Sequence, residues 1–238
     1  MQKSTQNWII VTAGGKGTRM KAGVNKIFLP IFGIPIIVHT LKTLENHPLI
    51  QRVVITVPKG DLEKLEQTIK EHRLSKVVKL IPVNQERQQN TFKALKWIKE
   101  NSGFDTDLIG IHNAVNTLVT EDEISAVFKV ADAIGGALLA YHAKDTTKIC
   151  DENNLVVQTP IRKFVWSAQT PQVGKLEDLL TAFKKAEKDN FLGTDDTQLL
   201  ERIGIKIKVV PCSKDNFKIT FPEDLILAEK ILQERQNV

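Results

Sequence analysis

The chain has few of the residues that cross-link small secreted folds or hold zinc. Its 238 residues include two cysteines, Cys150 and Cys212, which lie far apart in the sequence without further thiols or histidines beside them. This spacing excludes a disulfide framework and a cysteine-ligated zinc site. We therefore interpret both thiols as buried or chemically idle.

The sequence also lacks long apolar runs. No stretch approaches the roughly 20 consecutive apolar residues that span a bilayer. The first seven residues, MQKSTQN, lack the apolar core of a signal peptide. With 42% hydrophobic and 26% charged residues, the chain has the composition of a globular protein that buries a core. We expect it to be cytoplasmic, with no membrane partner.

Dense basic clusters and aromatic residues are scarce as well. The formal net charge is +5 and the pI is about 9.1, but the lysines are spread along the chain, and aromatic residues make up 6% with a single tyrosine. Nucleic-acid surfaces usually combine clustered lysines and arginines with stacking aromatics. We therefore expect no nucleic-acid partner, and a modest preference for phosphorylated small molecules such as a nucleoside triphosphate.

What is present is a glycine-rich turn after an apolar run, in the segment IIVTAGGKGTRMKAGVNKIFLP that begins at Ile9. A P-loop needs a longer spacing between its glycines and a lysine after the second one, and a dinucleotide fingerprint needs a third glycine where Met20 stands. The remaining interpretation is a turn whose N–H groups wrap a triphosphate, with charge from Lys16, Arg19 and Lys26. A plain strand-to-helix connection is the alternative.

The rest of the chain alternates short β-branched runs with longer segments of helical periodicity, which predicts an α/β fold. The expected strands are residues 8–11, 52–57, 76–82, 108–112, 136–143 and 205–210. The expected helices are residues 36–44, 62–71 (capped by Asp61), 90–99, 121–133, 176–188, 197–203 and 222–235.

The pattern changes between about residues 144 and 167. Short β-prone pieces at 148–150, 156–158 and 163–166 are separated by the strong turn signal DENN. This predicts a β-hairpin arm. We expect a single domain over residues 1–238, a Rossmann-like three-layer sandwich with a mostly parallel twisted sheet and this protruding arm inserted.

Six ordered motifs resemble those of the 2-C-methyl-D-erythritol 4-phosphate cytidylyltransferase family, among the sugar-phosphate nucleotidyltransferases. They are AGGKGTRM followed by Lys26, Glu86-Arg87 before a helix, KDTTK from Lys144, TPQ from Thr170, TDD from Thr194, and DNFKIT from Asp215 with the following PEDL. The resemblance covers nearly the whole chain in the right order.

The resemblance implies a magnesium-dependent reaction of the non-mevalonate isoprenoid pathway. The substrate's 4-phosphate attacks the α-phosphorus of CTP, and pyrophosphate leaves. Lys26 and Lys218 match lysines that stabilise the α-phosphate in the transition state, and Arg19 and Lys16 would hold the leaving phosphates. The resemblance assigns the remaining CTP contacts to Ala13, Gly14, Gly15, Gly17, Thr18, Asn84, Gln85, Arg87 and Asn90.

The resemblance also implies a homodimer formed through the arm. Thr146 and Arg162 match positions that bind the methylerythritol phosphate, and an arginine suits a terminal phosphate because its planar fork donates two parallel hydrogen bonds. Thr170 and Thr194 match nearby hydroxyl positions, although turn or helix-cap roles are the alternative for both. Magnesium would be held by Asn113 and Asp215.

The chain departs from the family pattern after the fourth predicted strand. The family has HDAARP there, whereas this chain has HNAVNT, so Asn113 replaces the metal-binding Asp and Asn116 replaces an acceptor-binding Arg. An amide oxygen is a poorer partner for a hard cation than a carboxylate. Three interpretations remain: retained activity, another acceptor such as ribitol 5-phosphate, or a weak or silent nucleotide-binding paralogue.

Overall fold

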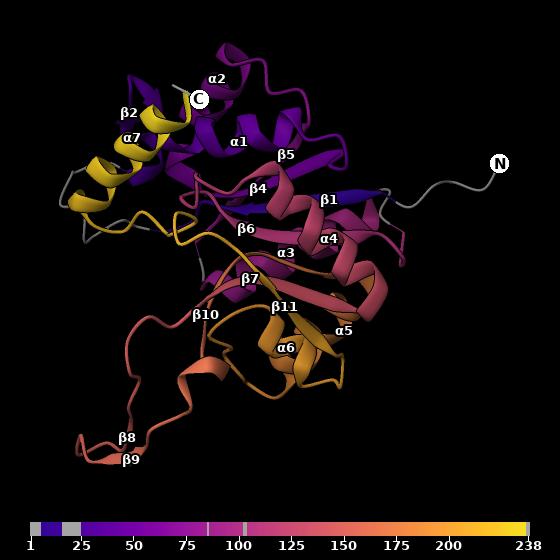
Figure 1. The fold of residues 1–238 in the computed structure, drawn as a ribbon. Coiled ribbons are helices and arrows are strands. Elements are labelled where there is room, and N and C mark those ends of the chain that lie inside the picture. Colours follow the sequence, from indigo (N-terminus) through magenta and orange to yellow (C-terminus); the bar gives the residue numbers. More distant parts are fainter. Residues whose placement is uncertain (1–5, 16–24, 85, 102–103, 237–238) are drawn as a thin grey trace.

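The computed structural model describes residues 6–15, 25–84, 86–101 and 104–236. Its centre is a seven-stranded sheet with the order β11-β7-β10-β6-β1-β4-β5, and helices cover both faces (Figure 1). The strands are β1 (Asn7–Thr12), β4 (Arg52–Pro58), β5 (Val77–Val83), β6 (Leu108–Asn113), β7 (Gly136–His142), β10 (Trp166–Lys175) and β11 (Ile207–Pro211). The helices are α1 (Ile36–Asn46), α2 (Leu62–Glu71), α3 (Arg87–Glu100), α4 (Glu121–Ile134), α5 (Leu176–Lys188), α6 (Thr197–Glu201) and α7 (Pro222–Gln236).

Shorter elements complete the chain. Two small antiparallel pairs are β2 (Pro30–Ile31) with β3 (Ile34–Pro35), and β8 (Ile149–Cys150) with β9 (Val156–Gln158). Single 3-10 turns are η2 (Lys26–Phe28), η3 (Lys59–Asp61) and η4 (Arg162–Phe164). In the part of the chain with described structure, no helix is long and apolar enough to cross a membrane.

Strand β1 lies inside the sheet because its apolar residues are continuous. Ile9 and Val11 face one core, while Trp8 and Ile10 face the other. Successive side chains of a strand point to opposite faces, so a strand covered on both sides is apolar throughout. The turn that follows β1 is therefore held at a fixed place, at the carboxyl end of a buried parallel strand.

Each face of the sheet has its own helical layer. The apolar sides of α1, α4 and α7 pack with Leu65 of α2 in one core, and those of α3, α5 and α6 form the second. The two layers and the sheet between them make the predicted three-layer sandwich. All seven expected helices are present; α2 and α5 have the predicted bounds, and each of the others has at least one end that differs by up to three residues.

Strand β10 was not predicted from the sequence. It runs antiparallel between β6 and β7, whereas the other neighbouring strands of the sheet are parallel. Its polar residues and Pro171 suggest a loop, because a proline cannot donate to a ladder. The structure accommodates Pro171 where the register with β7 shifts, between Ala168 and Gln172.

Three local expectations need correction. Asp61 occupies the position before α2 but makes no side-chain cap, because its carboxylate accepts a hydrogen bond from Asn25 Nδ2 at 2.8 Å. Helix α3 starts at Arg87, three residues before the predicted start at Asn90. The β-prone piece at 163–166 is split between η4 and the first residue of β10.

The arm is present as predicted. The hairpin of β8 and β9 lies between β7 and β10 in the sequence and projects away from the sheet (Figure 1). Its turn is closed by Asp151, whose carboxylate accepts from the backbone N–H groups of Asn153 and Leu155, both at 2.9 Å. Cys150 is exposed on this hairpin, so of the two expectations for this thiol, burial is wrong and chemical idleness stays a prediction.

Candidate functional site

The candidate site is built at the carboxyl ends of β1 and β6, which pair in parallel so that Thr12 lies opposite Asn113. Polar loops at the carboxyl ends of parallel strands are where open α/β sheets bind their ligands. The glycine-rich turn leaves β1 here, with the N–H of Ala13 donating to Thr56 at 2.8 Å. The predicted site residues Lys16, Gly17, Thr18, Arg19 and Gln85 lie outside the described residues.

The described part of the turn contacts the start of α3. A Cβ atom on Gly14 would lie 3.3 Å from Val83 Cγ2 and 3.5 Å from Nδ2 of the buried Asn90. A side chain at Gly14 would therefore crowd Val83 and touch Asn90, which is a physical reason for glycine at this position. Of the predicted nucleotide contacts, the structure brings Gly14 and Asn90 together, while Asn84 and Gly15 are exposed close by in sequence.

The two predicted catalytic lysines come from opposite ends of the chain and meet at one segment. Lys26 lies in η2 with 7% of its surface exposed, and its Nζ donates to the carbonyl of Ile219 at 2.8 Å. Lys218 is the residue before Ile219, and it is exposed. The local fold holds Lys26 there because Asn25 accepts from the N–H of Ile27 and so caps η2.

A buried network of uncharged polar groups occupies the end of β6. His112 lies with Nε2 3.1 Å from the carbonyl of Asn116 and Nδ1 2.9 Å from the hydroxyl of Thr170. Because a carbonyl oxygen can only accept, Nε2 carries the proton and Nδ1 accepts from Thr170. The same hydroxyl accepts from the N–H of Asn113 at 3.2 Å.

Burial keeps His112 neutral. Desolvation lowers the pKa of its imidazole to about 4, although the backbone groups of Asn116 and Thr170 oppose this shift. A neutral ring fits a site whose other members are amides and a hydroxyl. Sequence reasoning assigned no role to His112, because its partners lie on a different strand and a later turn.

The two asparagines that depart from the family pattern are bonded to one another. Asn113 Nδ2 donates to Asn116 Oδ1 at 3.0 Å, and Asn113 Oδ1 lies 3.3 Å from the hydroxyl of Thr12. Asn116 is fully buried, although the sequence suggested an acceptor-binding residue at this position. Its two amide hydrogens are donated to Gln169 Oε1 and to the carbonyl of Asn216, at 3.1 and 3.0 Å.

The start of α3 is tied to the segment between α5 and α6. Arg87 forms an ion pair with Asp196, whose side chain is 2% exposed. Burial raises the pKa of Asp196, and the neighbouring guanidinium opposes that shift. Gln172 Oε1 in turn accepts from the backbone N–H groups of Asp196 and Thr197 at 2.8 and 3.0 Å. The motifs TPQ and TDD, which the sequence linked only by resemblance, are thus in direct contact.

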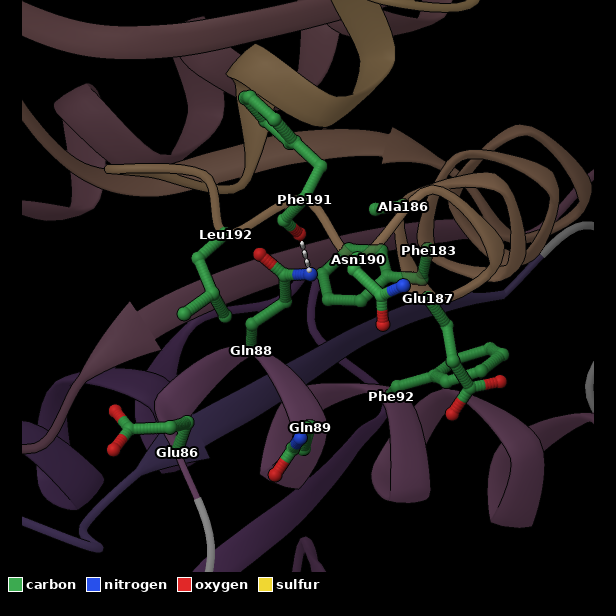
Figure 2. Close-up of a pocket in the computed structure, with 10 residues that line it drawn as sticks. All are labelled: Glu86, Gln88, Gln89, Phe92, Phe183, Ala186, Glu187, Asn190, Phe191 and Leu192. Atoms are coloured by element: carbon green, nitrogen blue, oxygen red, sulfur yellow. Dashed lines mark hydrogen bonds between the residues drawn. The ribbon is translucent and has the colours of Figure 1, made fainter.

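Two pockets adjoin the start of α3 and share Glu86, Gln88 and Leu192 in their linings. One of about 180 Å³ is lined by Arg87, Asp196 and the exposed Thr194, whose N–H donates to Gln198 Oε1 at 2.8 Å. The other, of about 250 Å³, lies between α3 and the end of α5 (Figure 2). Gln88 spans the boundary, since its Nε2 donates to the carbonyl of Phe191 at 2.9 Å and its Oε1 accepts from Gly193. Thr194 therefore lies on the Arg87 side of the site.

The remaining predicted acceptor contacts lie on the arm. Thr146 and Arg162 are both exposed, and Arg162 Nη1 donates to the carbonyl of Lys144 at 3.3 Å. This bond closes the base of the arm across 18 residues. The predicted acceptor residues thus form separate groups, with Thr170, Asn113 and Asn116 at the sheet and Thr146 and Arg162 on the arm.

The proposed metal ligands have different surroundings. The hydroxyl of Thr12 lies 3.3 Å from both Asn113 Oδ1 and the carbonyl of His112, and its single proton cannot serve both. The Asn113 oxygen could therefore take a cation. The Asp215 carboxylate lies 3.6 Å from Arg235 Nη2 and already faces a positive charge. Within the described ranges, no three His, Cys, Asp or Glu side chains gather as a metal site.

The sequence matches known proteins over nearly its full length. The sequence model of the 2-C-methyl-D-erythritol 4-phosphate cytidylyltransferase family matches residues 8–234. A protein of that name from Syntrophus aciditrophicus is 39% identical over 96% of this chain and 96% of its own length. Another from Geobacter metallireducens is 37% identical over 95% of this chain and 97% of its own length.

Solved structures match the fold over similar lengths. A 4-diphosphocytidyl-2C-methyl-D-erythritol synthase from Anaerococcus prevotii superposes with a TM-score of 0.83 at 25% identity, covering 96% of each chain. A 2-C-methyl-D-erythritol 4-phosphate cytidylyltransferase from Francisella tularensis gives 0.80 at 27% identity, covering 95% of this chain and 99% of that one. These matches confirm the predicted Rossmann-like α/β fold class.

Proposed function

Because the chain belongs to the 2-C-methyl-D-erythritol 4-phosphate cytidylyltransferase family, it is a nucleotidyltransferase, and we propose that it transfers CMP from CTP to 2-C-methyl-D-erythritol 4-phosphate with release of pyrophosphate. The observation that supports this reaction best is the meeting of Lys26 with the segment that carries Lys218. Two lysines that meet at one segment suit a reaction in which negative charge grows on a phosphate.

Each site residue is assigned to one part of the substrates. Lys26 and Lys218 stabilise the α-phosphate while the acceptor phosphate attacks in line, because such a transfer depends mainly on positioning and charge stabilisation. Lys16 and Arg19 hold the β- and γ-phosphates and favour departure of pyrophosphate. The contacts to the rest of CTP are assigned to Ala13, Gly14, Gly15, Gly17, Thr18, Asn84, Gln85, Arg87 and Asn90.

The ion pair of Arg87 with Asp196 supports the nucleotide assignment. Asp196 holds the guanidinium at the start of α3, so Arg87 would reach the nucleotide from a fixed position. A guanidinium held by a buried carboxylate loses less rotamer freedom when it binds a ligand.

For the acceptor, we assign the methylerythritol portion to Asn113, Thr170 and Thr194 and the terminal phosphate to Thr146 and Arg162. The two arm residues are exposed, and the projection of the arm from the sheet suits a site completed by the arm of a second copy. We therefore propose a homodimer formed through the arm. Because CTP is a cytoplasmic metabolite, we also propose a cytoplasmic location.

Nucleotidyltransferases commonly use a divalent metal, and we propose Mg²⁺ for this one. Mg²⁺ keeps several waters and often binds through one or two protein oxygens together with substrate phosphates, which suits a site whose candidate protein oxygen is that of Asn113. When bound, the metal would neutralise charge on the triphosphate. Asp215 remains a second candidate ligand, provided that the cation displaces Arg235 from it.

The test is pyrophosphate release from CTP and Mg²⁺ with each of two acceptors, 2-C-methyl-D-erythritol 4-phosphate and ribitol 5-phosphate. The neutral Asn113 and Asn116 pair is the observation that favours including the second acceptor. Release with the first acceptor supports the proposal, and release with ribitol 5-phosphate alone reassigns the substrate. Calorimetric binding of CTP without release for either acceptor would identify a silent nucleotide-binding paralogue.

A further inference from the structure

Asn116 stands out because its side chain is completely buried and joins three segments of the chain. Its two amide hydrogens are donated to Gln169 Oε1 of β10 and to the carbonyl of Asn216, at 3.1 and 3.0 Å. Its Oδ1 accepts from Asn113 Nδ2 at 3.0 Å. With both donors used and no exposed surface, the amide has nothing left to donate to a substrate.

The backbone of Asn116 is fixed as firmly as its side chain. Its N–H donates to the carbonyl of Asn113, and its own carbonyl accepts from Nε2 of the buried His112, both at 3.1 Å. A residue held at both its backbone and its side chain is a rigid support for the chain segment that is hydrogen-bonded to it.

The segment that Asn116 supports carries Lys218 and accepts the hydrogen bond of Lys26. Asn216 accepts from Asn116 and also donates through Nδ2 to the carbonyl of Thr170 at 2.9 Å. Three residues later the N–H of Ile219 donates to the carbonyl of Val115 at 2.9 Å, and the carbonyl of Ile219 accepts from Lys26 Nζ. Lys218 lies between these two attachment points.

We propose that Asn116 is a positioning residue for Lys26 and Lys218, acting through the Asn216–Ile219 segment, and that it does not contact the acceptor. This inference rests on the proposed function. Loss of the amide would release the attachment of the Asn216 carbonyl to Asn116, close to Lys218 in the chain, and would loosen the Ile219 carbonyl that supports Lys26. Displacement of a catalytic group by about 1 Å can lower turnover roughly 100-fold.

The kinetic test compares Asn116→Ala and Asn216→Ala with the wild-type protein and a matched control. Thr117→Val is the control, because Thr117 is also buried and polar, is adjacent in sequence, and donates instead to the carbonyl of Ile36 in α1. We expect both asparagine variants to lower kcat by about 10- to 100-fold, with the KM for the acceptor within about twofold of wild type. Thr117→Val should leave kcat within about twofold.

Two results would overturn the proposal. A rise of about tenfold or more in acceptor KM with kcat retained would show that Asn116 is a direct ligand. An equal loss of kcat in Thr117→Val, at the same loss of melting temperature, would show a general effect on the fold. If Asn116→Ala does not fold, Asn116→Ser replaces it, because serine keeps a small polar side chain. The expected fall in kcat and the two contradicting results are then judged from Asn116→Ser and Asn216→Ala.

A second measurement separates this inference from the proposed reaction. The Lys218 amine can be ¹³C-methylated and assigned by comparison with Lys218→Arg, and its NMR signal can be followed without any substrate. We expect the signal to shift in Asn116→Ala and to stay in place in Thr117→Val. An unchanged signal in Asn116→Ala refutes the positioning, even for an active enzyme. A shifted signal in a protein that releases no pyrophosphate supports the positioning and contradicts the proposed function.

Discussion

At the scale of single residues, the site has a cationic side and a neutral side. Lys26 and Lys218 lie where the nucleotide phosphates are proposed to bind, and the described groups at the end of β6 are His112, Asn113 and Asn116. Burial keeps the histidine uncharged. Negative charge that develops on the substrates therefore interacts with the lysines, while the groups of the neutral side hold one another in place by hydrogen bonds.

Lys26→Met tests the cationic side. The substitution keeps most of the length of the side chain and removes the charge, so stabilisation of the α-phosphate should be lost. We expect kcat to fall about 100- to 1000-fold, the usual effect of removing one transition-state donor. Circular dichroism and thermal melting check that the fold remains. Retention of more than about a tenth of the turnover would mean that Lys26 does not act on the reacting phosphate.

Asn113→Asp tests the neutral side. A carboxylate is a better magnesium ligand than an amide, so we expect half-maximal activity at lower Mg²⁺ concentration. The same change places an oxygen against Asn116 Oδ1, and loss of that hydrogen bond should lower the free energy of unfolding by about 1–3 kcal/mol. Magnesium titration of the initial rate and urea unfolding measure the two effects. An unaltered magnesium dependence would exclude the metal from the Asn113 side chain.

His112 predicts a pH dependence of stability. Its pKa is about 4 in the folded protein and 6.5 in an unfolded chain, so the unfolded chain binds more protons between these values. The contribution of His112 to the free energy of unfolding is fully present above pH 6.5 and is lost as the pH falls towards 4. The loss amounts to about 3 kcal/mol at most. Urea unfolding at several pH values measures the loss. The difference from His112→Gln isolates this histidine, and an equal slope in both proteins would contradict the prediction.

At the scale of elements, helices and loops differ in how far the sequence determines them. The seven helices follow from apolar periodicity, and α5 has the predicted bounds, Leu176–Lys188. Strand β10 could not be predicted because Pro171 and its polar neighbours Thr170 and Gln172 are typical of a loop. The glycine-rich turn was recognisable because its residues are adjacent in sequence. The His112 network was not, since Thr170 lies 58 residues from His112 and Asn216 lies 100 residues from Asn116.

Helix α4 offers a test of local stability away from the site. Thr120 accepts from the N–H of Glu123, and Glu123 accepts from the N–H of Thr120, which forms a complete capping box. We expect Thr120→Ala to lower the free energy of unfolding by about 1 kcal/mol, with activity retained. Thr120→Ser should keep the cap and most of the stability. Equal losses in both variants would show that the methyl group, rather than the cap, matters.

At the scale of the whole molecule, the arm carries the exposed apolar surface expected of an interface. Leu155, Val157 and Phe164 are 66%, 63% and 70% exposed on an arm that projects from the body (Figure 1). Apolar side chains gathered on such a projection usually mark a contact with another chain. The proposed dimer would bury them and would bring the arm residue Arg162 near a second site.

The dimer can be tested by mass. We expect light scattering to give twice the chain mass of 26.7 kDa for the wild-type protein, and Leu155→Asp with Phe164→Asp to give a monomer with a raised acceptor KM. Ile226→Asp is the matched control, because Ile226 is 71% exposed on α7 and lies outside the arm. Dissociation in the control, or a monomeric wild type, would contradict an arm-mediated dimer.

The position of β10 in the sheet also affects how the protein folds during synthesis. Both neighbours of β7 in the sheet, β10 and β11, follow it in the chain, and β10 is the strand that joins β7 to β6. While the ribosome is still translating the arm, β1, β4, β5 and β6 can already pair, but the strands that pair with β7 have yet to be made. Pairings that wait for distant segments form slowly and leave strand edges open to aggregation. The nascent chain should therefore need chaperone protection most between the emergence of β7 and that of Lys175.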